Sequence, residues 1–163
     1  MLKQFVTAAS LTAAALSSSL AFAADDARSA IHITADIPTN SFHVLPRNPN
    51  FGKDEYMGYN PASSTLNPLR QVFDVKNTDG SVHAYIDGGP QSLSNGSNDI
   101  ALTTTFNGVT LTATPQEVVD DASSNGGTAA DMLISAAKPL ANQTGRYVAD
   151  MTVIFDAVPR APR

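Results

Sequence analysis

Apolar and polar side chains alternate along much of the chain beyond residue 30, and this period of two predicts β-strands. The first such run is Ile31-His32-Ile33-Thr34-Ala35-Asp36-Ile37, which ends at Pro38 because proline donates no backbone hydrogen bond. The segments with this pattern or a strand-like composition are 31–37, 69–75, 81–86, 100–106, 109–112, 131–136 and 146–156. Short strands at intervals of about ten residues predict an all-β protein built as a β-sandwich.

Turn residues separate the predicted strands. Asn107-Gly108 between two β-rich runs predicts a type I′ hairpin, whose two turn residues both take a positive φ. Residues 77–80 predict another turn, in which Gly80 takes a positive φ. Three segments are expected outside the strands: the proline-rich 38–68 as irregular loops with short edge pieces, 115–119 as one turn of helix, and 123–129 as a loop.

The segment 146–156 predicts the last strand of the sandwich. Its more apolar face, and hence its candidate core face, carries Tyr147, Ala149, Met151, Val153 and Phe155. No further strand is expected after it, because residues 157–163 contain two prolines and two arginines. We therefore expect a flexible C-terminal tail over 157–163.

The N-terminal residues 1–23 are expected to be a cleaved secretory signal peptide. Lys3 provides the positive start, a short apolar stretch follows, and Ala21-Phe22-Ala23 gives the small-x-small pattern of a cleavage site with Ala21 and Ala23. A membrane anchor is the alternative, but the stretch is short and diluted by threonine and serine. Removing 23 of the 163 residues leaves a mature chain of 140, enough for one exported domain.

Composition and charge exclude several classes of protein. The chain is 42% hydrophobic and 15% charged, and ten basic against fifteen acidic residues give a net charge of −5, which argues against nucleic-acid binding. Without cysteine it has no disulfide, thiol catalysis or cysteine-bound metal. An exported domain without disulfides depends on its own core, on a metal or on a partner. The three histidines show no ligand spacing, so neither a metal site nor a cofactor is expected.

No residue pattern recommends an enzyme. The sequence lacks a Gly-x-Ser-x-Gly elbow, a phosphate-binding glycine loop and a His-Glu-x-x-His helix. The adjacent carboxylates Asp54-Glu55 and Asp120-Asp121 are interpreted as exposed polar turns, since neighbours on one segment rarely converge on one substrate atom. The sequence therefore indicates a binding or structural protein, although it does not exclude a hydrolase.

Four stretches in order resemble the major subunits of the class 5 (alpha) fimbriae, the chaperone–usher group that includes the colonization factor and cable pili. They are the alternating run Ile31–Pro38, the segment Tyr59-Asn60-Pro61-Ala62-Ser63-Ser64, the hairpin 100–112 followed by Glu117, and Leu133-Ile134-Ser135-Ala136-Ala137 leading to Gly145-Arg146-Tyr147-Val148-Ala149. Together they span nearly all of the mature chain.

The resemblance implies an incomplete immunoglobulin-like sandwich, over residues 38–156, that is completed by a donor strand from a neighbouring subunit. The donor would be the N-terminal segment 24–37, with Ile31, Ile33, Ala35 and Ile37 facing inward. The acceptor groove would be lined by the five core-facing residues of 146–156 named above. The pattern alone leaves open whether 31–37 is instead the first strand of its own sheet, because alternation does not say which chain the partner strand belongs to.

The same resemblance implies export through the periplasm to a cell-surface fimbrium that supports attachment to host surfaces. The implied partners are identical neighbouring subunits, a periplasmic chaperone, an outer-membrane usher, a tip adhesin subunit and, in some systems, a host receptor. Two alternatives stay open: a minor or tip adhesin of the same pilus, and a monomeric secreted β-sandwich that binds carbohydrate or protein. A tip adhesin is disfavoured because it typically carries a second, lectin-like domain.

Overall fold

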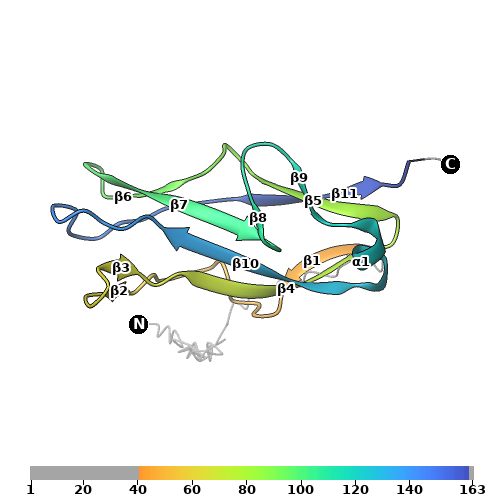
Figure 1. The fold of residues 1–163 in the computed structure, drawn as a ribbon, viewed down its shortest axis with the longest axis horizontal. Helices are drawn as coiled ribbons and strands as arrows, with labels where there is room; N and C mark the ends of the chain where they lie inside the picture. The colour runs from red at the N-terminus through yellow and green to blue at the C-terminus, as the bar shows by residue number, and fades with distance from the viewer. Residues whose placement is uncertain (1–40, 162–163) are drawn as a thin grey trace, which may run out of the picture. The chain divides into compact units, whose positions relative to one another are not determined.

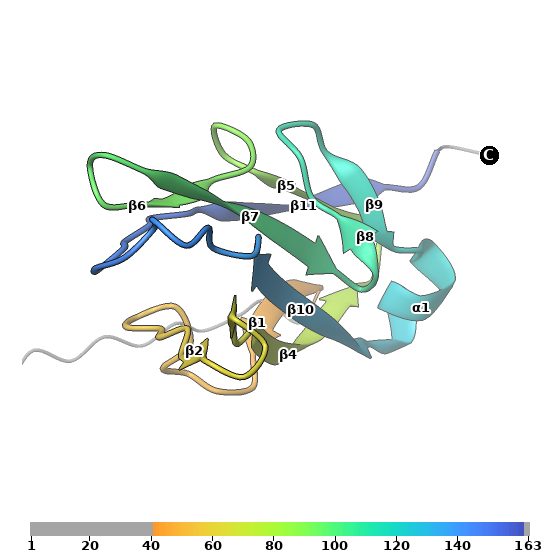
Figure 2. The ribbon, with the colours of Figure 1, turned by 60° about the vertical axis from the view of Figure 1, so that its left-hand side comes forward.

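Two antiparallel sheets pack against each other around one apolar core (Figures 1 and 2). The computed structural model describes residues 41–161. The larger sheet has the strand order β1-β4-β10-β7-β6, with β8 paired to β7, and the smaller sheet has the order β11-β5-β9. A two-stranded ribbon, β2-β3, forms a third, separate sheet. The prediction of an all-β sandwich is confirmed, and the architecture is immunoglobulin-like.

The elements have the following bounds. The larger sheet contains β1 (Phe42–Pro46), β4 (Leu69–Asn77), β6 (Ser92–Ser94), β7 (Asp99–Phe106), β8 (Val109–Thr110) and β10 (Thr128–Ala136). The smaller sheet contains β5 (Gly80–Ile86), β9 (Gln116–Val119) and β11 (Val153–Pro159). The ribbon pairs β2 (Tyr59–Asn60) with β3 (Thr65–Leu66), and the short helix α1 is Asp121–Gly126.

Alternating side chains of the central strands build the core. On β7 the even-numbered residues from Ile100 to Phe106 are buried, and on β5 the buried apolar residues Val82, Ala84 and Ile86 face them from the other sheet. Asn107 and Gly108 close the β7–β8 hairpin with φ values of 49° and 80°, so the predicted type I′ turn geometry is confirmed.

The turn between β4 and β5 carries the chain from one sheet to the other. Asn77, which is buried, donates through Nδ2 to the carbonyl of Ser81 at 2.7 Å and accepts at Oδ1 from the amide of Asp79 at 3.1 Å. Gly80 has no positive φ, so that expectation is wrong. The reason for glycine is steric: a Cβ at Gly80 would lie 2.0 Å from the carbonyl oxygen of Val158 on β11.

Two expectations about the segment after β8 need correction. Residues 116–119 form strand β9 rather than a helical turn, because they pair with the open edge of β5. Most of the expected loop 123–129 is instead α1 and the start of β10. The Asp120 side chain caps α1 by accepting from the amide of Ser123 at 2.7 Å, and the Ser124 hydroxyl donates to the carbonyl of Gly80 at 2.6 Å.

The last strand lies later in the chain than predicted. Val148 forms a bridge with Ser94 of β6 in the larger sheet, whereas residues from Val153 onward pair with β5 in the smaller one. Residues 149–152 therefore cross from the larger sheet to the smaller one. The segment 146–156 is thus not one continuous strand. At its other end, β11 reaches Pro159, so the first residues of the expected flexible tail are paired strand.

Candidate functional site

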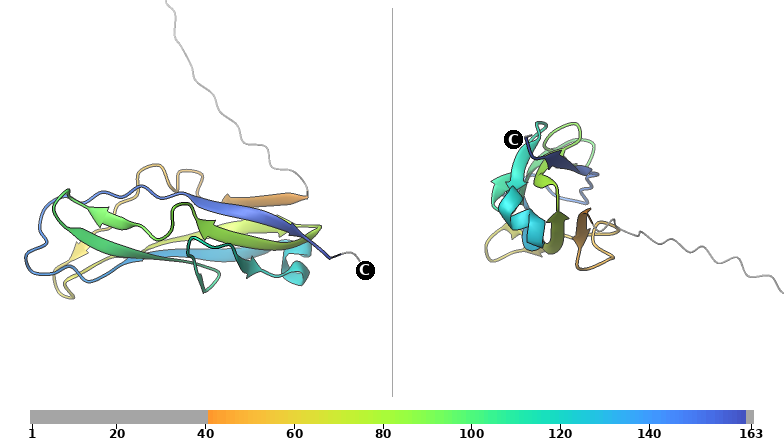
Figure 3. Two further views of the ribbon diagram at one scale, coloured as in Figure 1. Left: turned by 90° about the horizontal axis from the view of Figure 1, so that it is seen from above. Right: turned by 90° about the vertical axis from the view of Figure 1, so that its right-hand side faces the viewer.

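The strands β1 and β11 lie along the same side of the sandwich, one in each sheet (Figure 3). Within residues 41–161, β1 pairs only with β4 and β11 pairs only with β5. Each is thus the last strand of its sheet, and the sandwich is not closed between them. We call the side bounded by β1 and β11 the open side.

Apolar side chains on the open side face the core but are incompletely covered. They pack against the buried residues of the central strands and yet are only half-buried, unlike the core-facing residues of β5 and β7. These side chains are Phe42 and Val44 of β1, Val153 and Phe155 of β11, and Met151 just before β11. A sandwich normally buries such a row beneath another strand, so the open side presents apolar surface next to strand edges.

Aromatic rings connect the open side to the centre of the core. The Phe155 ring lies 4.9 Å from the ring of Phe106 and 6.1 Å from that of Phe73, measured between centroids. Phe106 is fully buried, whereas Phe155 is half-buried. A strand covering Phe155 would therefore extend the existing core rather than form a separate contact.

The five predicted acceptor residues fall into two groups. Met151, Val153 and Phe155 pack against the core on the open side. Tyr147 and Ala149 precede β11; Ala149 is exposed, and Tyr147 is half-buried. The pattern did not distinguish the groups because period-two alternation continues through the segment that passes between the sheets.

Sequence reasoning expected short edge pieces within 38–68 but did not place β1, which is one of them and supplies the other border of the open side. Phe42 and Val44 alternate with His43 and Leu45, but the surrounding prolines favoured an irregular assignment for 38–68. The expected donor residues Ile31, Ile33, Ala35 and Ile37 lie outside the described residues, as do the cleavage-site residues Ala21 and Ala23.

The end of β11 is fixed to α1 and to the β4–β5 turn. The amide of Arg160 donates to the carbonyl of Asp79 at 2.8 Å, and its guanidinium bonds the Asp121 carboxylate through both Nε and Nη2, the latter at 2.6 Å. Hydrogen bonding to the Arg160 guanidinium lowers the pKa of the Asp121 carboxyl below its ordinary value. One border of the open side is thus held in place at this end.

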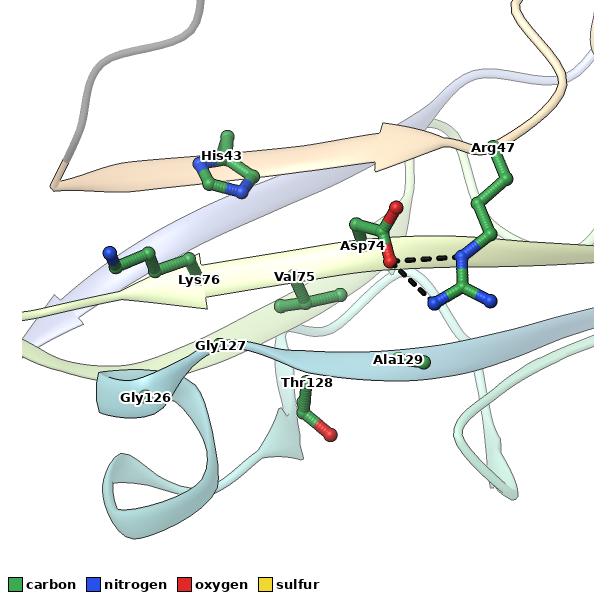
Figure 4. Close-up of a pocket in the computed structure, with 9 residues that line it drawn as sticks. All are labelled: His43, Arg47, Asp74, Val75, Lys76, Gly126, Gly127, Thr128 and Ala129. Atoms are coloured by element: carbon green, nitrogen blue, oxygen red, sulfur yellow. Dashed lines mark hydrogen bonds and ion pairs between the residues drawn. The ribbon is translucent and has the colours of Figure 1, made fainter.

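A shallow pocket of about 370 Å³ lies beside β1, on the outer face of the larger sheet (Figure 4). Arg47 reaches Asp74 with Nε at 3.0 Å and Nη2 at 2.8 Å from Oδ1, while His43 and Lys76 line its other part. The hydrogen bonds from Arg47 lower the pKa of the Asp74 carboxyl. The arrangement is an ion pair on a surface and holds no nucleophile with an adjacent base.

Residues 41–161 contain no cluster of three metal-ligating side chains. In the same part of the chain, no helix is long and apolar enough to span a membrane.

Comparisons with known proteins agree with this geometry. A family model, the CS1 type fimbrial major subunit, matches residues 27–156. The solved structure of the CooA pilin subunit from enterotoxigenic Escherichia coli is similar, with a TM-score of 0.53 at 17% sequence identity, covering 74% of this chain and 90% of that chain. At that identity the likeness establishes the fold alone. No curated protein sequence matches the chain.

Proposed function

The chain belongs to the CS1 type fimbrial major subunit family, whose members are structural pilus subunits, and we propose that it polymerises by accepting a β-strand from a neighbouring copy. The neighbour's residues 24–37 form that strand and lie along the open side, between β1 and β11. The observation that carries this proposal is the row of half-buried, core-facing apolar side chains along two end strands of the sandwich.

The donor segment has the pattern that such a site requires. Ile31, Ile33, Ala35 and Ile37 share one face, so a strand with backbone hydrogen bonds to an edge presents all four to the core. Burying three large aliphatic side chains and an alanine contributes about 5–10 kcal/mol before ordering costs. The acceptor contacts are Val153, Phe155 and Met151 from one border and Val44 from the other.

Repetition of this contact gives a filament. The donated segment and the open side are different surfaces of the same chain, so the contact is heterologous and need not close into a ring. Until assembly, the open side exposes apolar surface, which a periplasmic chaperone covers with a strand of its own. The remaining steps follow the chaperone–usher route: cleavage of residues 1–23, passage through an outer-membrane usher, and growth behind a tip adhesin of a fimbria that attaches to host surfaces.

Paired substitutions in the donor segment test the proposal. Ile33→Asp places a charge on the buried face, whereas His32→Asp places the same charge on the solvent face. We expect Ile33→Asp to abolish filaments seen by electron microscopy and oligomers seen by size exclusion, and His32→Asp to retain both. Filaments formed equally by both variants would contradict donor-strand assembly.

A second measurement separates loss of assembly from loss of folding. The Ile33→Asp chain keeps an intact open side, so it is expected to bind a synthetic peptide of residues 24–37 and to gain resistance to urea on binding. A folded Ile33→Asp chain that does not bind the peptide would count against an acceptor site between β1 and β11.

A further inference from the structure

Asparagine followed by glycine occurs three times in the sequence, at Asn95-Gly96, Asn107-Gly108 and Asn125-Gly126. Asparagine is chemically least stable before glycine, because glycine has no side chain to keep its backbone nitrogen away from the preceding carboxamide. All three asparagines are exposed, so access to water does not distinguish them. Their hydrogen bonds do.

The turn between β6 and β7 holds the carboxamide of Asn95. Its Oδ1 accepts from the amide of Ser97 at 3.0 Å and from that of Asn98 at 2.8 Å. The amide of Gly96, whose nitrogen would attack the carboxamide, donates to the hydroxyl of Ser94 at 3.2 Å. Attack at Asn95 therefore requires several hydrogen bonds to break together.

The β7–β8 hairpin holds the carboxamide of Asn107. Its Nδ2 donates to the carbonyl of Val118 at 2.7 Å, and its backbone amide donates to the carbonyl of Asp131 at 2.8 Å. Its φ of 49° belongs to the turn that joins the two strands. The carboxamide of Asn107 therefore turns toward Gly108 only if contacts with two other strands are lost.

Asn125 lies beyond the last anchored residue of α1. Within residues 41–161, its side chain takes part in no hydrogen bond or ion pair. The helix is held at its start by the Asp120 cap and in its middle by Ser124, which is buried and donates to the carbonyl of Gly80. After Ser124, only residues 125–127 remain before β10, and all three are exposed.

The end of α1 has little to keep it closed. A helix of six residues is too short to be stable by itself, and helix ends fray. The amide of Gly127 closes the last turn by donating to the carbonyl of Ser124 at 3.1 Å, and nothing lies within 4 Å of the Cβ position of Gly126. Opening this turn frees the nitrogen of Gly126 and breaks no strand pairing (Figure 2).

We propose that Asn125 is a self-modification site, at which the folded chain converts asparagine to aspartate and isoaspartate. The backbone nitrogen of Gly126 bonds to Cγ of Asn125, and the bond between Cγ and Nδ2 breaks. The Nδ2 group leaves as ammonia with the proton from the Gly126 amide. Water then opens the succinimide ring: attack at Cγ gives aspartate, and attack at the main-chain carbonyl gives isoaspartate. Nothing is oxidised or reduced.

The conversion changes the charge where β11 is tied to α1. Asn125 lines a surface pocket together with Asp121 and Arg160. The new carboxylate stands four residues after Asp121 on the helix, where two like charges repel each other. It also lies at the C-terminal end of the helix, where negative charge is unfavourable. The isoaspartate product adds a carbon to the backbone, so it does not keep the geometry of an α-helix.

Incubation of the folded full chain in mildly alkaline buffer tests the proposal, with peptide mapping by mass spectrometry as the measurement. Acid at position 125 is expected to accumulate about tenfold faster or more than at positions 95 and 107, because those sites must first lose hydrogen bonds. Conversion at position 95 or 107 that is as fast as at position 125 overturns the inference.

The same incubation in urea separates the effect of the fold from that of local sequence. Unfolding removes the hydrogen bonds that protect Asn95 and Asn107, so the three rates are expected to come within about threefold of each other. If Asn125 keeps its full lead in urea, the preference does not come from the structure and the inference is overturned.

The isoaspartate product and a matched variant test attack by Gly126. Isoaspartate at position 125, detected with an isoaspartyl methyltransferase, is expected together with aspartate, whereas direct hydrolysis by water gives aspartate alone. Gly126→Ala has room for its methyl group and is expected to slow conversion at position 125 by about tenfold, without changing the rates at 95 and 107. Aspartate without isoaspartate, or an unchanged rate in Gly126→Ala, contradicts the proposal.

Discussion

At the scale of single residues, the most specific requirement is the lack of a side chain at Gly80. The chain passes between the sheets here, and β11 lies so close that the Val158 carbonyl occupies the space of a Cβ. Glycine is needed for close approach of two strands and not for its backbone dihedral, because its φ is not positive. The same β11 forms one border of the open side.

Gly80→Ala is expected to lower the free energy of unfolding by about 2 kcal/mol, because the added methyl group pushes β11 away from β5. Gly126→Ala is the matched control: nothing lies within 4 Å of its Cβ position, and its φ is not positive. Since alanine is the better helix former, that variant is expected to be neutral or slightly stabilised. Urea unfolding compares them, and equal stability of the two variants would contradict the steric argument.

At the scale of elements, β11 is fixed most firmly at its C-terminal end, where an ion pair adds to the strand pairing. Its start follows residues that pass between the sheets, whereas its end is bonded to the β4–β5 turn and, through Arg160, to α1. The ion pair is partly exposed, so its contribution to stability is modest and depends on pH and salt.

Asp121→Asn is expected to reduce stability at neutral pH and to have progressively less effect in acid. The native pKa of Asp121 is lowered, so its contribution is present above the unfolded-state pKa of about 3.9 and is lost as pH falls through the native value. Urea midpoints of both chains from pH 7 to pH 2 measure this. Arg160→Gln completes a double-mutant cycle, and a difference that grows in acid would contradict the assignment.

At the scale of the whole molecule, the open side lies between β1 and β11, the end strands of the two sheets on that side of the sandwich. Phe155 lies where the core meets that side and touches the buried rings of Phe73 and Phe106. If assembly proceeds by the proposed donor strand, folding and assembly both depend on this side chain.

Phe155→Ala is expected to destabilise the chain by about 2–3 kcal/mol, less than a fully buried phenylalanine would cost. It is also expected to weaken binding of the 24–37 peptide by about tenfold or more, because the donated strand loses its contact with the ring cluster. Ile154→Ala, on the outer face of β11, is the control and leaves peptide binding unchanged. Fluorescence titration with a labelled peptide measures both, and equal affinity for the two variants would place the acceptor site elsewhere.

Local patterns were sufficient for part of the fold. The alternation on β7 and β5 predicts which of their side chains are buried, and Asn107-Gly108 predicts its hairpin from backbone preference alone. These features depend on residues that are close together in the sequence, so the sequence alone is sufficient to predict them. The ordered motifs also indicate the family.

Only the tertiary structure decided which strand pairs with which and where the sandwich is open. Residues 146–152 alternate like a strand, yet Val148 belongs to the edge of one sheet and Val153 to the other. Residues 42–46 become β1 because β4 offers an edge, and 116–119 become β9 because β5 does. A period of two describes any strand, and the choice of partner depends on contacts between residues far apart in the chain. The sequence by itself therefore determined the central strands and indicated the family, while tertiary pairing decided several edge strands and the borders of the open side.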